Sequence, residues 1–479
     1  MVCGGWQRPS EADNLTAMNA QGRNPSDPES ILKVSLGFLF IAIGVFVADF
    51  CYLFFSKPRG FPNPVASLGF AAAIAGIIAL RAGRKSQVSD QDAAGSAHTR
   101  LFSPEGWGIF AVFVAFLVLY AVSGGIEISA NNIHVLQAVA FLRGQFQIDP
   151  DAAGENVIFG GLSYQLHPAF PAVLLMPFAA IWGEDTNQTI FALIIGALDV
   201  ALAWRLLGRM KVSTNIRVWL TLFFGAGTTI WWETINGGSW DMTRIIAIGF
   251  TLGALGEIFG RSRPVIVSLL AGLAALARSD LAPELPIYLA LVYTQRRNWV
   301  DLLWMLPGFA FAAAIYIAMN EVRFGGWYDM TWSIAAGGQP TSQLFQLYYL
   351  PRNLFALFFR APGLDAGRFP ILHPIEAGQA ITFLSPAFLL ALKPDFRKTA
   401  PLLILIAALL AAAPSLFFIY DGVPQVGARH FVPTFPFLLV LMAMGMPRRA
   451  DQFTKILITA SLALVTFTVW HVQVWGFAG

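Results

Sequence analysis

Acidic and basic side chains gather in a few polar segments between long apolar runs. Segment 124–186 holds Glu127 and Glu155, whose carboxylates could take a proton from a hydroxyl group. Later segments hold single arginines, whose guanidinium groups can clamp a phosphate. A cavity with both would suit group transfer from a phosphate-linked lipid donor to a hydroxyl acceptor. The predicted substrate-contacting residues are Arg278, Asp280, Arg352, Arg429, His430, Tyr164, His167 and Trp240.

Several of these residues also have a purely structural interpretation. Arg278 with Asp280 could hold a phosphate or could be an ion pair between helix ends, and Arg429 could simply extend toward the membrane surface. Arg352 could likewise have a structural role or contact the substrate. The segment 236–241, which contains Trp240, favours an outer turn and a helix N-cap, with substrate contact as the second interpretation. Aromatic side chains at such positions more often form an interfacial belt than a sugar site.

A divalent cation is a further possibility. His134 and His167 could bind one together with Asp149 or Asp151, although their spacing matches no metal-binding motif. The sequence contains no phosphate loop, dinucleotide fingerprint, CxxC pair or HExxH motif, which disfavours ATP-driven transport and NAD chemistry.

The composition indicates a membrane protein. Hydrophobic residues make up 56% of the 479 residues and charged residues only 12%, whereas a soluble protein has about 25% charged residues. The near balance of 31 basic and 28 acidic residues leaves no basic stripe for nucleic acid.

Apolar runs of spanning length predict an all-α, polytopic transmembrane bundle of about 11 to 14 spans. The predicted spans are 32–55, 63–80, 106–123, 187–207, 216–233, 241–259, 264–277, 281–294, 301–319, 379–392, 400–419, 431–446 and 455–473.

The short basic turns predict the orientation, because Lys and Arg accumulate in cytoplasmic loops. Residues 1–30 are then a disordered cytoplasmic tail, and 31–105 hold two extra spans and a basic cytoplasmic loop. The turn at Lys57 is the only basic turn that this orientation places on the outer side. Loops 124–186 and 320–378 face outward. The stretch 169–182 is then an interfacial or re-entrant helix, or alternatively a true span with a different helix count.

From Trp107 onward the order of features resembles the GT-C superfamily of polytopic glycosyltransferases. The resemblance is carried by NNIHVLQAVAFLRGQFQID, YQLHPAFPAVLLMPFAAIWG, ALIIGALDVALAWRLLGR, GLAALARSD, NEVRFGGWYDM, YYLPRNLFALFFRAPG and VGARHFVPTFPFL. It implies that 106–479 form a GT-C-like domain in the inner or plasma membrane. It also implies a polyprenyl-phosphate-linked sugar as donor and an extracytoplasmic glycan, lipid or protein as acceptor.

One position departs from the superfamily pattern. An acidic pair usually opens the first outer loop, but this chain has Asn131-Asn132, and an amide cannot act as a base. Glu155 is the preferred replacement, followed by Glu127 and then by Asp149 or Asp151. Loss of catalysis is the remaining alternative.

Two other functions compete with glycosyl transfer. A transporter or flippase of a lipid-linked sugar would need ionisable groups deep in the spans. Few lie there, and the main candidates, Asp49, Asp199 and Glu257, are each predicted near a span end, which counts against transport. A non-catalytic membrane subunit on the same scaffold is compatible with the missing acidic pair.

Overall fold

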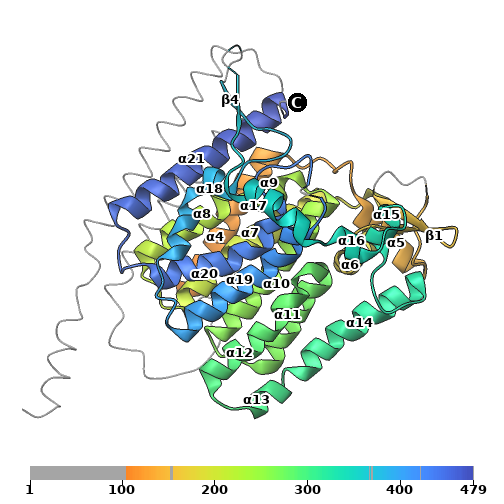
Figure 1. Cartoon of the computed structure of the whole chain (residues 1–479), viewed down its shortest axis with the longest axis horizontal. Coiled ribbons are helices and arrows are strands. Elements are labelled where there is room, and N and C mark those ends of the chain that lie inside the picture. The colour runs from red at the N-terminus through yellow and green to blue at the C-terminus, as the bar shows by residue number, and fades with distance from the viewer. Residues whose placement is uncertain (1–103, 151–154, 366, 368–370, 421, 478–479) are drawn as a thin grey trace, which may run out of the picture.

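The chain folds into a bundle in which most helices lie roughly side by side (Figure 1). This computed structural model describes residues 104–150, 155–365, 367, 371–420 and 422–477. The predicted tail 1–30 and nearly all of the predicted segment 31–105 lie outside the described residues.

The bundle is built around α7, which packs against α4 and α10, while α11 packs between α10 and α14. Tyr120 of α4 ties this centre together by donating a hydrogen bond to the carbonyl of Gly225 at 2.8 Å. The bundle elements, with η marking 3-10 helices, are α4 (Pro104–Gly124), α7 (Gln188–Arg209), α8 (Thr214–Ala226), α9 (Ile230–Asn236), α10 (Ser239–Ile258), α11 (Pro264–Ala277), η2 (Ser279–Glu284), α12 (Leu285–Arg296), α13 (Val300–Leu303), α14 (Leu306–Phe324), α18 (Ile381–Leu384), η4 (Pro386–Leu392), α19 (Thr399–Phe417), η5 (Arg429–Thr434), α20 (Phe435–Gly445) and α21 (Gln452–Trp475).

Five helical stretches in the described part are long and apolar enough to cross a membrane. Together with the composition they indicate a membrane protein. They are Glu105–Gly124, Gln188–Arg209, Val300–Phe324, Thr399–Phe417 and Gln452–Trp475.

Most predicted spans within the described residues coincide with a helix or with two consecutive helices. The prediction of one continuous helix over 379–392 was wrong. Here the four-residue α18 ends before Ser385, and the 3-10 helix η4 follows. Pro386 explains the break, because proline lacks the N–H that a continuing helix would use.

The basic turns gather at one end of the bundle. Arg217 at the start of α8 lies 3.5 Å from Glu105 of α4, and Lys393 after η4 lies 3.4 Å from Asp451 before α21. At the other end, Trp231 of α9 donates a hydrogen bond of 2.8 Å to Ser123 of α4. This grouping agrees with the alternation of basic and polar segments along the sequence.

The segment 124–186 contains helices α5 (Ile133–Leu142) and α6 (Phe170–Trp182), the 3-10 helix η1 (Gly183–Asp185) and a hairpin of β1 (Asn156–Phe159) and β2 (Leu162–Gln165). α6 has 13 residues and packs against α5. At about 1.5 Å per residue it is shorter than a hydrocarbon core of about 30 Å, as are α8 and α11.

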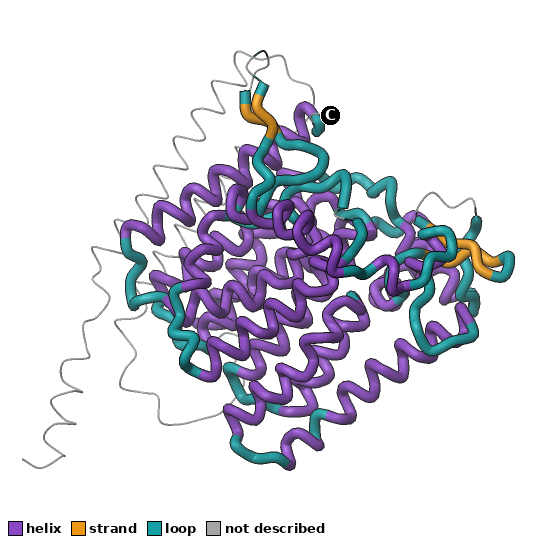
Figure 2. The backbone as a smooth tube through the Cα atoms, in the orientation of Figure 1, coloured by secondary structure: helices purple, strands orange, loops and turns teal. Residues whose placement is uncertain are grey.

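The segment 320–378 consists of short elements joined by irregular stretches at the edge of the bundle. The elements are α15 (Thr331–Ala335), α16 (Thr341–Leu344), η3 (Leu347–Tyr349), α17 (Leu350–Phe358), β3 (Gly363–Leu364) and β4 (Leu372–His373). Figure 2 shows the two hairpins, β1–β2 and β3–β4, projecting at the periphery. They are an exception to the predicted all-α fold, although the molecule is mostly helical.

Candidate functional site

A cavity of about 610 Å³ lies where α4, α9 and α10 end or begin near η5, and we call it the Glu155 cavity. It brings together side chains from segments that are far apart in the sequence. Its charged and amide side chains are those of Glu127, Glu155, Asn131, Asn236, Asp241, Arg429 and Gln473. Acids and an arginine therefore share one polar space.

A second cavity, of about 350 Å³, lies beside the first, and we call it the Arg278 cavity. Trp240 lines both cavities, so its indole forms part of the wall between them. The Trp240 ring centroid is 4.1 Å from that of His167 and 5.4 Å from that of Trp332. The polar side chains of the Arg278 cavity are His167, Thr243, Arg278, Ser279, Asp280, Tyr316, Ser415 and His430.

Glu155 and His167 form a close pair at the boundary of the two cavities. Glu155 Oε2 lies 3.0 Å from His167 Nε2, with the Glu155 side chain 40% exposed and that of His167 only 1%. The β1–β2 hairpin creates this contact: the Leu166 N–H donates to the Glu155 carbonyl at 2.9 Å, directly beyond the strand pair. Neither of these two atoms has a hydrogen-bond partner among the described residues, so the pair is a close contact without hydrogen-bond geometry.

Two buried histidines support this region. The rings of His134 and His167 are 5.5 Å apart, and His134 Nε2 lies 3.2 Å from the Ser239 carbonyl oxygen. Burial, and then the neighbouring His167, lower the pKa of His134 from 6.5 to about 3. Burial also lowers the pKa of His167, although Glu155 opposes the shift. Both imidazoles are therefore neutral near pH 7.

Arg244 of α10 is fully buried and pairs with two acids. Its Nε donates to Glu233 of α9, and its Nη2 donates to Asp241, three residues earlier in α10. Asn236 donates to the other oxygen of Asp241. Gly237, in the left-handed conformation at φ 60°, makes the sharp turn that brings α9 back against α10. Asp241 lines the Glu155 cavity, and Arg244 and Glu233 lie buried behind it.

Arg429 is the cationic group of the Glu155 cavity. Its guanidinium carbon lies 5.8 Å from the Trp240 ring centroid, and its Nη1 donates to the Pro424 carbonyl at 3.0 Å. Among the described residues its buried Nε has no hydrogen-bond partner. Burial, followed by the charge of Arg244, lowers the pKa of Arg429. The group retains hydrogen-bonding capacity for an anion.

Arg278 and Asp280 form a compact pair between α11 and η2. Arg278 Nη2 lies 2.5 Å from Asp280 Oδ2, and its Nε lies 3.0 Å from Oδ1. Both side chains are largely buried and both line the Arg278 cavity. The arginine is therefore held in a fixed position at a cavity wall.

The structure divides the predicted site residues into three groups. Glu155, Glu127, Arg429 and Trp240 line the Glu155 cavity, and Arg278, Asp280, His167 and His430 line the Arg278 cavity together with Trp240.

Arg352 and Tyr164 line neither cavity. Arg352 Nη2 donates to the carbonyls of Phe418, at 3.3 Å, and Ile419, at 2.5 Å, after the end of α19. Tyr164 is buried in a small hydrophobic cluster with Val157, Leu166 and Phe324. The contacts of both residues are structural.

Asp241, which lines the Glu155 cavity, and its buried partner Arg244 were not among the predicted site residues. The i, i+3 spacing of Asp241 and Arg244 was a visible signal for an ion pair on one helix. The N-cap residue of α10 is Gly238, and no side chain caps the helix. The Asp241 carboxylate is instead engaged by Arg244 and Asn236.

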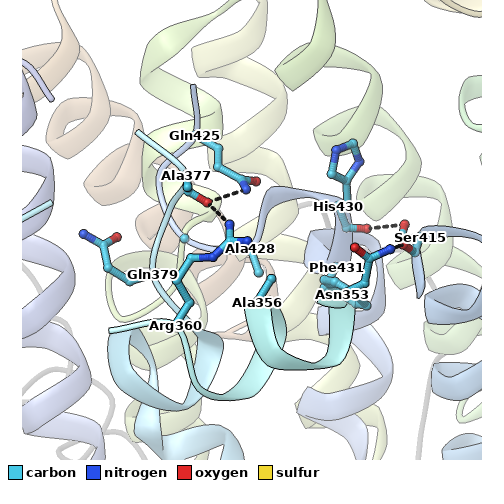
Figure 3. A pocket seen from close by; sticks show the side chains of 11 residues that line it. Asn353, Ala356, Arg360, Ala377, Gln379, Ser415, Gln425, Ala428, His430 and Phe431 are labelled. Carbon is cyan, nitrogen blue, oxygen red and sulfur yellow. Dashed lines mark hydrogen bonds between the residues drawn. The ribbon is translucent and has the colours of Figure 1, made fainter. Parts of the chain in front are cut away.

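A third cavity, of only about 20 Å³, lies between α17 and η5 (Figure 3). Arg360 Nη1 and Gln425 Nε2 both donate to the Ala377 carbonyl, at 2.6 and 2.8 Å. This volume has room for about one water molecule. It is too small for a substrate, so the convergence of polar groups here is structural.

The suggested divalent-cation site has limited support. Asp151 lies outside the described residues, and within them no group of three His, Cys, Asp or Glu side chains could hold a metal ion.

Comparison with known protein families, with curated proteins and with solved structures finds no match. The function is therefore inferred from the geometry of the two cavities.

Proposed function

We propose that this protein is a membrane glycosyltransferase that moves a sugar from a polyprenyl-phosphate carrier to an extracytoplasmic acceptor. The observation that carries the proposal is that Glu155 and Arg429 line one cavity. The reaction requires a carboxylate to accept the proton of the acceptor hydroxyl and a guanidinium group to hold the leaving phosphate. The acceptor is a glycan, a lipid or a protein that offers a hydroxyl group. The shorter apolar helices complete a polytopic bundle in the inner or plasma membrane.

The proposed step is a direct displacement at the anomeric carbon. The acceptor oxygen forms a bond to this carbon while the bond to the phosphate oxygen breaks. Glu155 takes the acceptor's proton, and polyprenyl phosphate leaves with the electron pair and is held by Arg429. We assign His167 as a positioning residue, because its buried ring lies 3.0 Å from the Glu155 carboxylate that receives the proton. Trp240 offers an aromatic face to the sugar.

Glu127 and Asp241 are alternative bases in the same cavity. Glu127 is exposed, whereas Asp241 is already bound to Arg244 and Asn236. Glu155 is only partly engaged and partly exposed, which favours it as the group that exchanges a proton with a substrate.

Purified protein supplied with a panel of polyprenyl-phosphate hexoses and pentoses tests the proposal. Release of polyprenyl phosphate coupled to glycosylated product is the expected activity. Glu155→Gln is expected to lower kcat about 10²–10⁴-fold, the usual contribution of a general base. Glu184→Gln is the matched control, because Glu184 is exposed and pairs with Arg143 outside both cavities. Full activity of Glu155→Gln would transfer the role to Glu127 or Asp241, and full activity of all three amide variants would reject the mechanism.

A membrane-orientation experiment tests the same proposal from another side. Cysteines introduced at Ile158 and Arg297 should react with an impermeant reagent from opposite faces of intact cells. Ile158, in the β1–β2 hairpin, should be labelled from outside. Arg297 follows α12 among the basic turns, which are expected on the cytoplasmic side, and should be labelled from there. Labelling of Ile158→Cys only after the cytoplasm is opened would remove the extracytoplasmic site.

Transport of a lipid-linked sugar is the second candidate, because one observation favours it. Asp199 lies in the middle of α7 and is fully buried, and neither carboxylate oxygen has a hydrogen-bond partner among the described residues. Ionisable groups at such depth often belong to transport pathways. Flux of a polyprenyl-phosphate sugar across vesicles without any covalent product, abolished by Asp199→Asn, would favour transport over transfer.

A further inference from the structure

The outward side of η3 and α17 carries large apolar side chains that no described residue covers. Tyr348 is 82% exposed, Phe359 71% and Phe355 57%. Phe355 lies in α17, Phe359 directly follows it with its ring centroid 6.4 Å from that of Phe355, and Tyr348 lies in the preceding η3. Leu347 and Phe358 are also exposed on this segment. An aromatic surface of this kind is unusual for a side that faces water.

The opposite side of α17 is fixed to the end of α19. Asn353 Nδ2 donates to the carbonyls of Ser415, Leu416 and Phe418, at 3.1, 3.0 and 2.9 Å. Leu357 packs in a cluster with Ala412 and Phe431. α17 therefore supplies partners for the carbonyl groups that the last turn of a helix leaves free.

This attachment determines how deep α17 lies. α19 is one of the five helices long and apolar enough to cross a membrane, and it begins directly after the basic residue Lys398. Its last turn consequently lies at the opposite membrane boundary, and α17 lies at that level. A helix there that has one bound polar face and one bare aromatic face has the pattern of a helix lying in the interface.

We propose that α17 lies in the plane of the membrane and inserts Tyr348, Phe355 and Phe359 into the lipid interface of the leaflet where α19 ends. The bilayer is the occupant that fits this position, because aromatic side chains are favoured at the boundary between headgroups and acyl chains. The proposal does not depend on the proposed enzymatic function.

Site-directed spin labelling in lipid nanodiscs tests the insertion. The native Cys3 and Cys51 are replaced by serine, and single cysteines are introduced as Tyr348→Cys, Phe355→Cys and Phe359→Cys. All three positions are exposed, so the labels leave the packing of α17 on α19 intact. Gln339→Cys is the matched control, an exposed polar position in the same segment.

Collision rates with lipid-soluble oxygen and with a water-soluble nickel chelate distinguish the outcomes. The expected result is an oxygen-to-nickel ratio at positions 355 and 359 several-fold higher than at position 339. Equal ratios at all positions would show that the stripe faces water and would overturn the proposal. Protection from both reagents in nanodiscs made from native membranes would overturn it as well, since another protein would then cover the stripe.

Discussion

Arg244 is completely enclosed, and its charge is balanced by Glu233 and Asp241, which are also buried. Removal of the arginine alone leaves two buried carboxylates without their cation. We expect Arg244→Met to destabilise the protein by about 3–5 kcal/mol, seen as a lower unfolding midpoint in detergent.

A triple variant separates pairing from packing. Glu233→Leu, Arg244→Met and Asp241→Leu together remove all three charges and should be less destabilising than Arg244→Met alone. Arg143→Met is the control, because the Arg143–Glu184 pair is exposed and should contribute about 0–1 kcal/mol. A native-like unfolding midpoint for Arg244→Met would contradict the importance of the buried pairing.

Single residues show both the reach and the limit of sequence analysis. Glu155 and Arg429 could be selected because acids and arginines at a membrane boundary usually face a polar cavity, and both line one. Glu233 could not be paired with Arg244, because the two are eleven residues apart and meet only through the left-handed turn at Gly237. Tyr164 was assigned to the substrate site, but the pairing of β1 with β2 directs it into a hydrophobic cluster.

Among the helices, α11 and α14 approach closely through small side chains. A Cβ atom added to Gly308 of α14 would collide with Ser268 Oγ and with the backbone nitrogen of Leu269 in α11. One added to Gly272 of α11 would lie 2.7 Å from the Cβ of Ala312. Small residues of this kind allow membrane helices to pack closely.

Gly308→Ala should force the two helices apart and destabilise the protein by about 1–3 kcal/mol. Because Tyr316 of α14 lines the Arg278 cavity, the displacement should also weaken substrate binding there. Gly326→Ala is the control, since an added Cβ at that position meets nothing within 4 Å. The measurement is the unfolding midpoint in detergent, and equal midpoints for the two variants would refute the close contact.

The long apolar elements were predictable from the sequence, and the short ones were not. Runs of about 20 apolar residues locate α4, α7, α19 and α21, because a helix is the only compact form such a run takes in lipid. Prediction failed at 379–392, where a proline interrupts the run. The β1–β2 hairpin was missed although Gly160-Gly161, both with positive φ, supply its turn.

For the whole molecule, the neutral histidines at the cavities predict acid sensitivity. His134 and His167 have lowered pKa values in the folded protein, so the unfolded chain binds more protons below its own histidine pKa of about 6.5. Stability should therefore be complete near pH 7 and fall between about pH 6.5 and pH 5, at roughly 1.4 kcal/mol per pH unit for each histidine at most.

The unfolding midpoint in detergent, followed from pH 7.5 to pH 5, measures this dependence. The double variant His134→Gln, His167→Gln should flatten the curve, since glutamine keeps polar atoms but takes up no proton. A native midpoint that is unchanged across this range would mean that the two imidazoles are not held neutral.

The placement of Glu233, Asp241 and Arg244 also has a consequence for biogenesis. The partners of Arg244 are three and eleven residues away, all within α9 and α10. A nascent chain can thus neutralise its arginine inside one helical hairpin before any later segment has been translated. Insertion then carries the arginine together with its acidic partners, whereas an unpaired charge in the membrane would carry a penalty of several kcal/mol. This wall of the cavity can be assembled as soon as residue 258 has left the ribosome.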